Sequence, residues 1–403
     1  MKDRETIVAW LGLDWADEKH WVCLQEVGRE GVERFCLDQK PELLHERMRE
    51  LRQRFGGRQV AVVVEENRGP LLYALMQYDF LVLYPIAPKA LSSYRKTWRL
   101  SGAKDDPKDA ELLLRFALTH REYLTAWEAE EAPTRRLRTW VEQRRKLVEE
   151  KTRTTNRLKQ QLKEYFPQVL EWFSEVDSAL VLDFLSDWPS LQQVQRARRS
   201  TLERFFQRHH CRRERTRQRL EWIARGVALT DDPVVLQTHP LVVRLYVEQL
   251  RLLGRQIEEL EEEIEKVSER HEDQAIFASF PGAGRQLAPR LLVAFGTDRE
   301  RFDAYRMKCF SGIAPVTEQS GKSRWVHHRF VCAKFLKQTF HEFAQYSIPH
   351  CVWAHAYYHQ QRERGASQHE AIRALAAKWI PILTRCWKER TAYREEIYLE
   401  ALR

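Results

Sequence analysis

The stretch Ile7-Val8-Ala9-Trp10-Leu11-Gly12-Leu13-Asp14 decides the fold of the first part of the chain. Its apolar run predicts a short β-strand that ends on an acid. A second run, Val60-Ala61-Val62-Val63-Val64, ends on Glu65 in the same way. If the two strands are neighbours in one sheet, both acids lie at the same edge of that sheet.

The elements around these two runs predict an α/β domain over residues 1–125. Three early strands are followed by strands that alternate with helices, which is the order of a ribonuclease-H-like domain. The predicted strands are Val8–Leu13, Trp21–Gln25, Val32–Leu37, Val60–Glu65 and Phe80–Tyr84. The predicted helices are Pro41–Phe55, Leu71–Gln77 and Pro88–Arg99. The Gly56-Gly57 pair breaks the first of these helices.

Two more acids precede a helical pattern, Asp106 and Asp109 in Lys104-Asp105-Asp106-Pro107-Lys108-Asp109-Ala110. Residues three apart share one face of a helix, so these two can converge with the acids at the strand ends. Converging carboxylates repel one another unless a divalent cation neutralises them. Two such cations are the usual apparatus of phosphodiester chemistry, and the pattern therefore points to a nucleic-acid enzyme.

Other acids lie beside the predicted ligands. Asp17, Glu18, Glu66 and Asp105 satisfy the same spacing and remain alternatives. Adjacent residues of a strand face opposite sides of the sheet, so only one of Glu65 and Glu66 can face the site. We predict that it is Glu65.

The overall composition sets the class of protein. The chain has 403 residues, with 67 Lys and Arg against 58 Asp and Glu, and a net charge of +9. This balance favours a polyanionic partner, and the length allows two or three domains. The N-terminus does not resemble a signal peptide, and no run reaches the roughly 18 apolar residues of a membrane span. We expect no membrane association and a cytoplasmic location, in a bacterium or archaeon, near the nucleoid.

Seven scattered cysteines are expected to be reduced thiols, and His209-His210-Cys211 lacks a second pair of metal ligands.

Residues 126–275 are expected to form a basic helical region. Thr134–Lys163 contains eleven Lys and Arg against three Glu, and Arg196–Arg219 contains ten Arg against two Glu. That excess of arginine and lysine is too large to be explained by ion pairs along the helix, so we predict contact with phosphates.

A coiled coil is predicted from a stripe of apolar residues that alternate four and three apart. The stripe is Tyr246, Leu250, Leu253, Ile257, Leu260, Ile264 and Val267. It can serve a dimer or an intramolecular hairpin with Thr134–Lys163.

Residues 276–403 are expected to form a mostly helical third domain. Phe280-Pro281-Gly282-Ala283-Gly284 predicts a hairpin that opens a helix and offers backbone N–H groups to a phosphate. Further on, Ser320 precedes Gly321 in a basic segment that we expect to be a flexible loop. By spacing alone, a serine here is more often a turn residue than a nucleophile.

These motifs together resemble the IS110 insertion-sequence transposases, the family that includes the pilin-gene invertase Piv. The resemblance covers nearly the whole chain. Gly12-Leu13-Asp14, Glu65–Leu71 and Lys104–Ala110 resemble the RuvC-like domain of the family, whose four metal-binding acids fall on Asp14, Glu65, Asp106 and Asp109. The helix that follows in the family matches Asn156, Leu158 and Phe166-Pro167. Phe280–Gly284, Gly312–Pro315 and Ser320-Gly321 resemble its C-terminal transposase domain, which contains a nucleophilic serine. That serine falls on Ser320, with Ser323 as the alternative.

The resemblance implies a metal-dependent DNA transposase, with Mg²⁺ or Mn²⁺ bound by the four acids and no small-molecule cofactor. It implies covalent serine–DNA intermediates, a non-coding bridge RNA as guide, and a dimer or tetramer in which acids and serine come from different subunits. The chain departs from the family at Glu66-Asn67 and in the basic segment Trp325–Arg329. Two other hypotheses stay open. One is a metal-dependent, structure-selective nuclease that uses water, like a junction resolvase, and the other is a non-catalytic nucleic-acid-binding protein.

Overall fold

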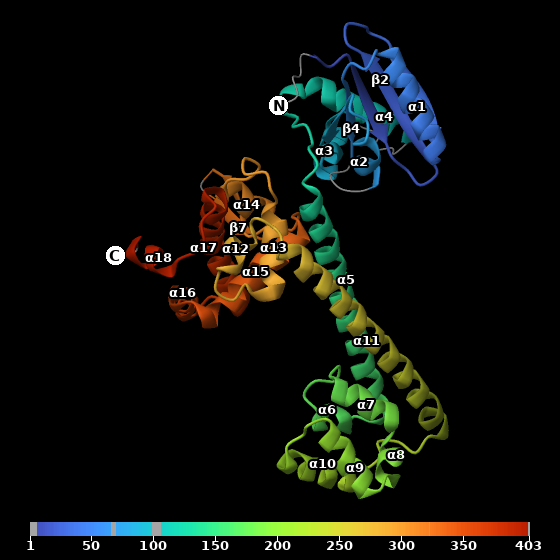
Figure 1. The fold of residues 1–403 in the computed structure, drawn as a ribbon, viewed down its shortest axis with the longest axis vertical. Helices are drawn as coiled ribbons and strands as arrows, with labels where there is room; N and C mark the ends of the chain where they lie inside the picture. The colour runs from blue at the N-terminus through green and yellow to red at the C-terminus, as the bar shows by residue number, and fades with distance from the viewer. Residues whose placement is uncertain (1–5, 66–69, 99–105, 322, 402–403) are drawn as a thin grey trace. The chain divides into compact units, whose positions relative to one another are not determined.

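The computed structural model describes residues 6–65, 70–98, 106–321 and 323–401 (Figure 1). Contacts within the chain divide it into two compact units, residues 1–129 and 130–403. In the described ranges, no helix is both long enough and apolar enough to cross a membrane.

The first unit is built on a five-stranded mixed sheet. Its strands lie in the order β3-β2-β1-β4-β5, with β1 antiparallel to β2 and parallel to β4. The strands are β1 (Ala9–Asp14), β2 (Lys19–Glu26), β3 (Val32–Asp38), β4 (Val60–Val64) and β5 (Leu81–Pro85). The expected α/β class is therefore observed, as is the expected order along the chain of three early strands followed by strands that alternate with helices. The arrangement is consistent with a RuvC-like domain.

Helices cover both faces of this sheet. They are α1 (Pro41–Arg54), α2 (Pro70–Leu75), α3 (Pro88–Trp98) and α4 (Asp106–Thr119). Alternate residues of β1 enter two different cores: Leu11 and Leu13 pack with α1 and α2, whereas Trp10 packs with α3 and α4. This period of two assigns each strand residue to one face, and it also decides which way the strand-end acids point.

The second unit begins with a long helical hairpin. Helices α5 (Ala132–Tyr165) and α11 (Pro233–Ser268) lie against each other over most of their length (Figure 1). A bundle of short helices closes the far end of this hairpin around its own apolar core. These helices are α6 (Gln168–Trp172), α7 (Ala179–Asp187), α8 (Leu191–Arg196), α9 (Arg199–Arg208) and α10 (Arg213–Arg225).

The hairpin corresponds to one of the two arrangements that the sequence left open. Within one chain, Leu250, Ile257 and Ile264 of the predicted stripe are buried on the inner side of α11, as an intramolecular hairpin requires. Tyr246, Leu253, Leu260 and Val267 are only half-buried. A coiled coil between chains stays a prediction.

The C-terminal part of the second unit is mostly helical, as predicted. Its largest core includes Trp379 and Trp387 and also contains Leu137 of α5 and Ile264 of α11, which joins it to the base of the hairpin. Its helices are α12 (Gln274–Ala278), α13 (Gly284–Phe295), α14 (Ala304–Phe310), α15 (Lys334–Ser347), α16 (Val352–Glu363), α17 (Gln368–Glu389) and α18 (Glu395–Ala401).

One expectation for this part was wrong. The segment around Ser320 is a two-stranded ribbon, β6 (Val316–Ser320) and β7 (Ser323–His327), rather than a flexible loop. The strands are short and both their faces are exposed, so the segment lacks the alternation of apolar and polar residues by which a strand is recognised in sequence.

Candidate functional site

Asp14 and Glu65 lie at the ends of neighbouring parallel strands. Leu13 of β1 is opposite Val64 of β4, so the next residue of each strand leaves the sheet at the same edge. Parallel strands are about 5 Å apart, which places the two residues side by side. By alternation, Asp14 follows the side of Trp10, and Glu65 follows the side of Val63. Both side chains therefore belong to the face that α4 covers.

Helix α4 crosses β1 close to these acids. A Cβ atom on Gly12 would be 2.2 Å from the carbonyl oxygen of Ala110, so the helix backbone lies directly on the strand. The thiol of Cys23 on β2 donates to the carbonyl of Pro107 at 3.9 Å, which fixes the first turn of α4 over the same place. Asp109 precedes Ala110 and is only 2% exposed. It therefore approaches the face and the strand end to which Asp14 and Glu65 belong.

The remaining predicted ligands are only partly described. Asp106 is the first residue of α4, but its side chain lies outside the described residues, as do Glu66 and Asp105. Among the side chains that are described, no three His, Cys, Asp or Glu residues are close enough to bind one metal ion. The described acids thus share one edge and one face of the sheet without closing a complete ligand set.

An arginine that the sequence did not single out pairs with the buried acid. Arg95 of α3 reaches Asp109 with 3.1 Å between Nη2 and Oδ2. Its Nε is buried and has no hydrogen-bond partner among the described residues. Arg95 therefore supplies the positive charge that a buried carboxylate needs. No sequence signal identifies it, because the pair depends on how α3 packs beside α4.

Ser320, the predicted nucleophile, lies in the second unit at the end of β6. It is directly opposite Ser323, its sequence alternative, and Gly321 makes the turn with a φ of +56°. Both serines are exposed. A ribbon end of this kind presents a hydroxyl to a ligand as large as a nucleic-acid strand, but the exposure itself assigns no activity.

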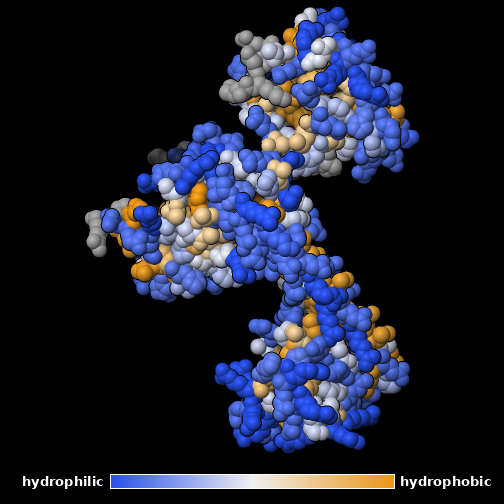
Figure 2. All heavy atoms as spheres, viewed as in Figure 1, coloured by the Kyte–Doolittle hydropathy of each residue, from blue (hydrophilic) through white to orange (hydrophobic). Residues whose placement is uncertain are grey.

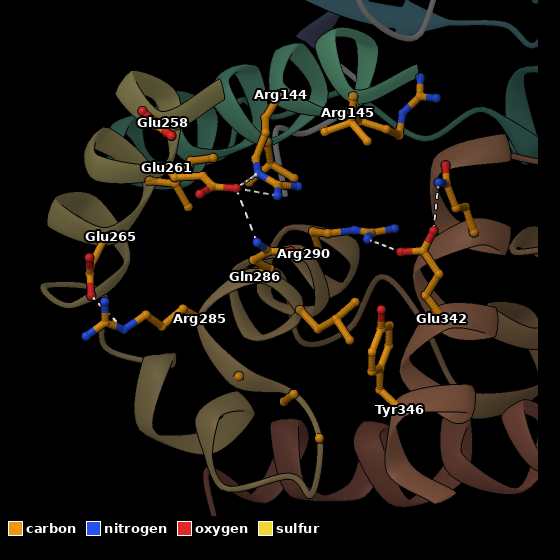
Figure 3. Close-up of a pocket in the computed structure, with 18 of the residues that line it drawn as sticks. Arg144, Arg145, Glu258, Glu261, Glu265, Arg285, Gln286, Arg290, Glu342 and Tyr346 are labelled. Carbon is orange, nitrogen blue, oxygen red and sulfur yellow. Dashed lines mark hydrogen bonds and ion pairs between the residues drawn. The ribbon is translucent and has the colours of Figure 1, made fainter. Parts of the chain in front are cut away.

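The Pro-Gly-Ala-Gly hairpin is formed as predicted and opens α13. Gly282 has a φ of +76°, and a Cβ there would be 2.4 Å from the carbonyl oxygen of Tyr346, so glycine is required. The hairpin lies on the wall of a cavity of about 850 Å³ between α5, α11, α13 and α15 (Figure 3).

Carboxylates of α11 already engage the polar side chains at the start of α13. Arg285 pairs with Glu265 at 3.2 Å, and Gln286 donates to Glu261 at 3.2 Å (Figure 3). Arg144 of α5 donates to the same Glu261. Arg290, deeper in the cavity, pairs with Glu342. A phosphate at this hairpin therefore has to compete with acids of the same chain, which the sequence motif alone did not indicate.

The arginine-rich segment forms α9, α10 and the turns beside them. Nine of its ten arginines are exposed, and Figure 2 shows hydrophilic side chains over much of the visible face of this bundle. The exception is Arg219, which lies 4.7 Å from the ring centre of Phe173 and donates to the carbonyl of Trp172. Arg219 is thus part of the packing of the bundle. The other nine are exposed to a polyanion, although Arg199 and Arg217 pair with acids of their own helices, Glu203 and Glu214, and Arg208 lies 3.9 Å from Asp187.

Comparison with known proteins identifies two matching regions. A family model described as a transposase matches residues 11–167, which include the four acids and the sheet apart from the first two residues of β1. A second, described as the transposase IS116/IS110/IS902 family, matches residues 274–359, which include the Pro-Gly-Ala-Gly hairpin and Ser320. The candidate mini-circle transposase for IS117 of Streptomyces coelicolor is 25% identical over 407 residues, covering 97% of each chain. The candidate transposase y4uE of Sinorhizobium fredii is 29% identical over 207 residues, covering 51% of this chain and 57% of that one.

Proposed function

This chain belongs to the IS110 family of transposases, and from that premise we propose that it excises and inserts a DNA element by attack of the Ser320 hydroxyl on DNA phosphodiesters. In this proposal Asp14, Glu65, Asp106 and Asp109 bind Mg²⁺ or Mn²⁺. The observation that carries it is that the two matched regions contain the two halves of such a site: the strand-end acids in one and the exposed serine in the other.

The donor set fits a hard divalent cation. Carboxylate oxygens are the ligands that Mg²⁺ and Mn²⁺ prefer, and β1, β4 and α4 direct them toward one end of one sheet face. A bound ion would act as a Lewis acid on the scissile phosphate. The protein itself contributes the rigid strand ends that position the acids and the Arg95 side chain that holds Asp109 in place.

The serine step needs no external energy source. The oxygen of Ser320 forms a bond to phosphorus while the bond from phosphorus to a deoxyribose oxygen breaks. The proton of the serine hydroxyl passes to a base or to solvent, and the departing sugar oxygen becomes a hydroxyl. Because the new ester keeps the phosphate activated, a strand can be rejoined without ATP, which agrees with the lack of a P-loop motif in the sequence.

The basic surfaces supply the second part of the proposal, the nucleic-acid partners. We propose that the exposed arginines of α9 and α10 contact phosphates of donor or target DNA, or of a bridge RNA that guides the reaction. Arginine suits both partners, since it makes bidentate phosphate contacts and stacks on unpaired bases.

A homo-oligomer is the third part. Leu241, Leu245 and Leu252 recur four and seven residues apart on α11, and all three are exposed. Figure 2 shows hydrophobic residues reaching the surface beside this part of the hairpin. An apolar stripe at this spacing fits a second helix, and we propose that it joins copies of this chain.

Trapping of covalent protein–DNA adducts tests the proposal. With DNA ends of the element, the bridge RNA and Mg²⁺, the full-length protein should form an adduct that survives denaturation. Ser320→Ala should abolish the adduct, whereas Ser323→Ala, the residue opposite it in the ribbon, should retain it. Asp14→Asn should lower the yield by a factor of about 100 or more, as expected when a metal site is lost.

Two outcomes contradict this assignment. Adducts at normal yield from Ser320→Ala place the nucleophile elsewhere. Cleaved DNA with free ends and no adduct identifies water as the nucleophile, and the protein is then a structure-selective nuclease.

A further inference from the structure

The β6–β7 ribbon leaves apolar side chains in solvent on both of its faces. Trp325 is 58% exposed and Val326 is 59% exposed, and Phe330 just beyond the ribbon is 85% exposed. All five residues of β7, Trp325 included, are exposed. A two-stranded ribbon with no cover is only marginally stable by itself, so this one is suited to bind a partner.

The strand register shows which side chains share a face. Ser320 is opposite Ser323, and the next pair on the same face is Glu318 opposite Trp325. Successive pairs on one face are about 7 Å apart. Thr317, Val326, Gln319 and Arg324 belong to the opposite face. Trp325 is therefore the large exposed ring on the face that presents the predicted nucleophile.

The charges of the ribbon select the kind of partner. Its single acid, Glu318, lies 3.3 Å from His327, which can neutralise it when the imidazole is protonated. The fixed cations of the described part of the segment are Arg324, which adjoins Trp325 in β7 but belongs to the opposite face, and the half-buried Arg329, which lies beyond the end of β7. Exposed aromatic rings with a basic surround are the combination that binds unstacked nucleic-acid bases.

We propose that Trp325 stacks on an unstacked DNA base next to the phosphate attacked by Ser320. This inference rests on the proposed function, because it takes Ser320 as the nucleophile. The distance of about 7 Å between successive pairs suits the separation of a phosphate and a neighbouring base along a strand. Trp325 then acts as a positioning residue: it fixes the strand so that the phosphate meets the serine hydroxyl.

Fluorescence of 2-aminopurine tests this inference on the full-length protein. The probe is single-stranded DNA of about 16 nucleotides that carries one 2-aminopurine, moved along the strand. The Ser320→Ala background prevents reaction. At one position, binding should quench the fluorescence, because a stacked 2-aminopurine is dark. Trp325→Phe should keep the quenching, whereas Trp325→Leu should remove it and weaken binding about tenfold.

Val326→Ala is the matched control, since Val326 is equally exposed on the opposite face; it should behave like the unmodified protein. If Trp325→Leu quenches and binds as before, the inference is wrong. If Trp325→Leu instead changes the oligomeric state measured by light scattering and leaves DNA affinity unchanged, the ribbon contacts protein, and the inference is also wrong.

The role of Trp325 and the assignment of Ser320 as nucleophile can be rejected independently of each other. The quenching is measured without the serine hydroxyl, so it can be observed even if Ser320 is not the nucleophile. In the reactive protein, Trp325→Leu should reduce the rate of adduct formation about tenfold and Trp325→Phe should restore it. Loss of adduct in Ser320→Ala together with a normal rate in Trp325→Leu would retain the proposed function and reject the role of Trp325.

Discussion

At the residue scale, Gly12 determines how closely α4 packs on β1 and therefore where the acids of the candidate site lie. It lies two residues before Asp14, and the missing Cβ is what lets the backbone of α4 lie on β1. The nearest atom that a Cβ would meet is a backbone carbonyl, which cannot rotate away as a side chain can. The position of Asp109 therefore depends on a residue that contacts no substrate.

Replacement of Gly12 by alanine should displace α4. Overpacking at such a contact costs about 1–3 kcal/mol of unfolding free energy, and the cost here belongs at the upper end because both partners are backbone. Urea unfolding monitored by circular dichroism measures this loss, and isothermal titration with Mg²⁺ measures the accompanying loss of metal affinity.

Gly31→Ala is the control in the same unit. No atom of the described residues lies within 4 Å of a Cβ at Gly31, so this change should leave the unfolding free energy within about 0.5 kcal/mol of the unmodified protein. Equal stability of the Gly12→Ala and Gly31→Ala proteins would show that α4 does not lie as close to β1 as described.

The sequence predicts the acids better than it predicts their surroundings. Asp14 and Glu65 could be placed because a strand has a period of two and both runs end on an acid. Arg95 could not, because nothing local to α3 indicates that it meets Asp109. Ser320 could be matched to a family motif, but its ribbon could not be predicted, since neither face of that ribbon is buried.

At the element scale, α11 shows how an apolar stripe predicted from the sequence can differ from the side of the helix that is buried. The predicted stripe, from Tyr246 to Val267, lies partly beside the buried side. The apolar residues buried on the inner side of α11 are Val243, Val247, Leu250, Ile257 and Ile264, which belong to a heptad seam of their own. Gly254 and Glu261 occupy two positions of that seam. Because neither has an apolar side chain, the seam does not appear as a continuous apolar stripe in the sequence. Glu261 is accommodated there because Arg144 of α5 pairs with it, a compensation that only the packed hairpin reveals.

The base of the same hairpin contains a buried histidine that makes stability depend on pH. Nε2 of His271 lies 2.9 Å from the hydroxyl of Thr134 at the start of α5, and its Nδ1 accepts the backbone N–H of Asp273 at 3.2 Å. Burial lowers the pKa of His271 below its ordinary value of 6.5, although Asp273 and Glu272 oppose the shift. The unfolded chain therefore binds a proton more readily than the folded one.

The sign of the effect follows from this difference in pKa. Above pH 6.5 both states are neutral at this site, and stability is unaffected. As the pH falls below 6.5, protonation favours the unfolded chain, and the unfolding free energy should decrease until the pH reaches the folded pKa. Thermal unfolding between pH 7.5 and pH 5 measures this decrease, and His271→Gln should make it smaller.

Thr134→Val is the control for this prediction. It removes the hydrogen bond but keeps the imidazole, so it should lower the unfolding free energy by about 1 kcal/mol at every pH without flattening the pH dependence. An unchanged pH dependence in His271→Gln would assign the effect to other buried groups, such as His20, whose pKa burial also lowers.

At the scale of the whole molecule, the two halves of the proposed site belong to different units of the chain. The acids lie in residues 1–129, and Ser320 lies in residues 130–403. The sequence predicted both halves, through strand-end acids and through the family motif, but it cannot show whether one subunit or two complete a site. Periodicity and motifs describe segments of one chain, whereas that choice depends on contacts between chains.

A mixing experiment distinguishes the two arrangements. One inactive protein carries Asp14→Asn and keeps Ser320, and the other carries Ser320→Ala and keeps its acids. If each site combines acids of one subunit with the serine of another, mixed oligomers contain intact sites, and covalent adduct should reappear. With equal amounts and random assembly of dimers, about half of the dimers are mixed and each has one intact site, so the yield should recover to about a quarter of normal.

The label on the adduct makes the result unambiguous. A size tag on the Asp14→Asn protein should appear in every adduct, because only that protein has the serine. A mixture of Asp14→Asn with Asp109→Asn is the matched control: both proteins lack an acid, every site is defective, and no adduct should form. If the first mixture is as inactive as this control while light scattering shows that mixed oligomers have formed, acids and serine act within one subunit.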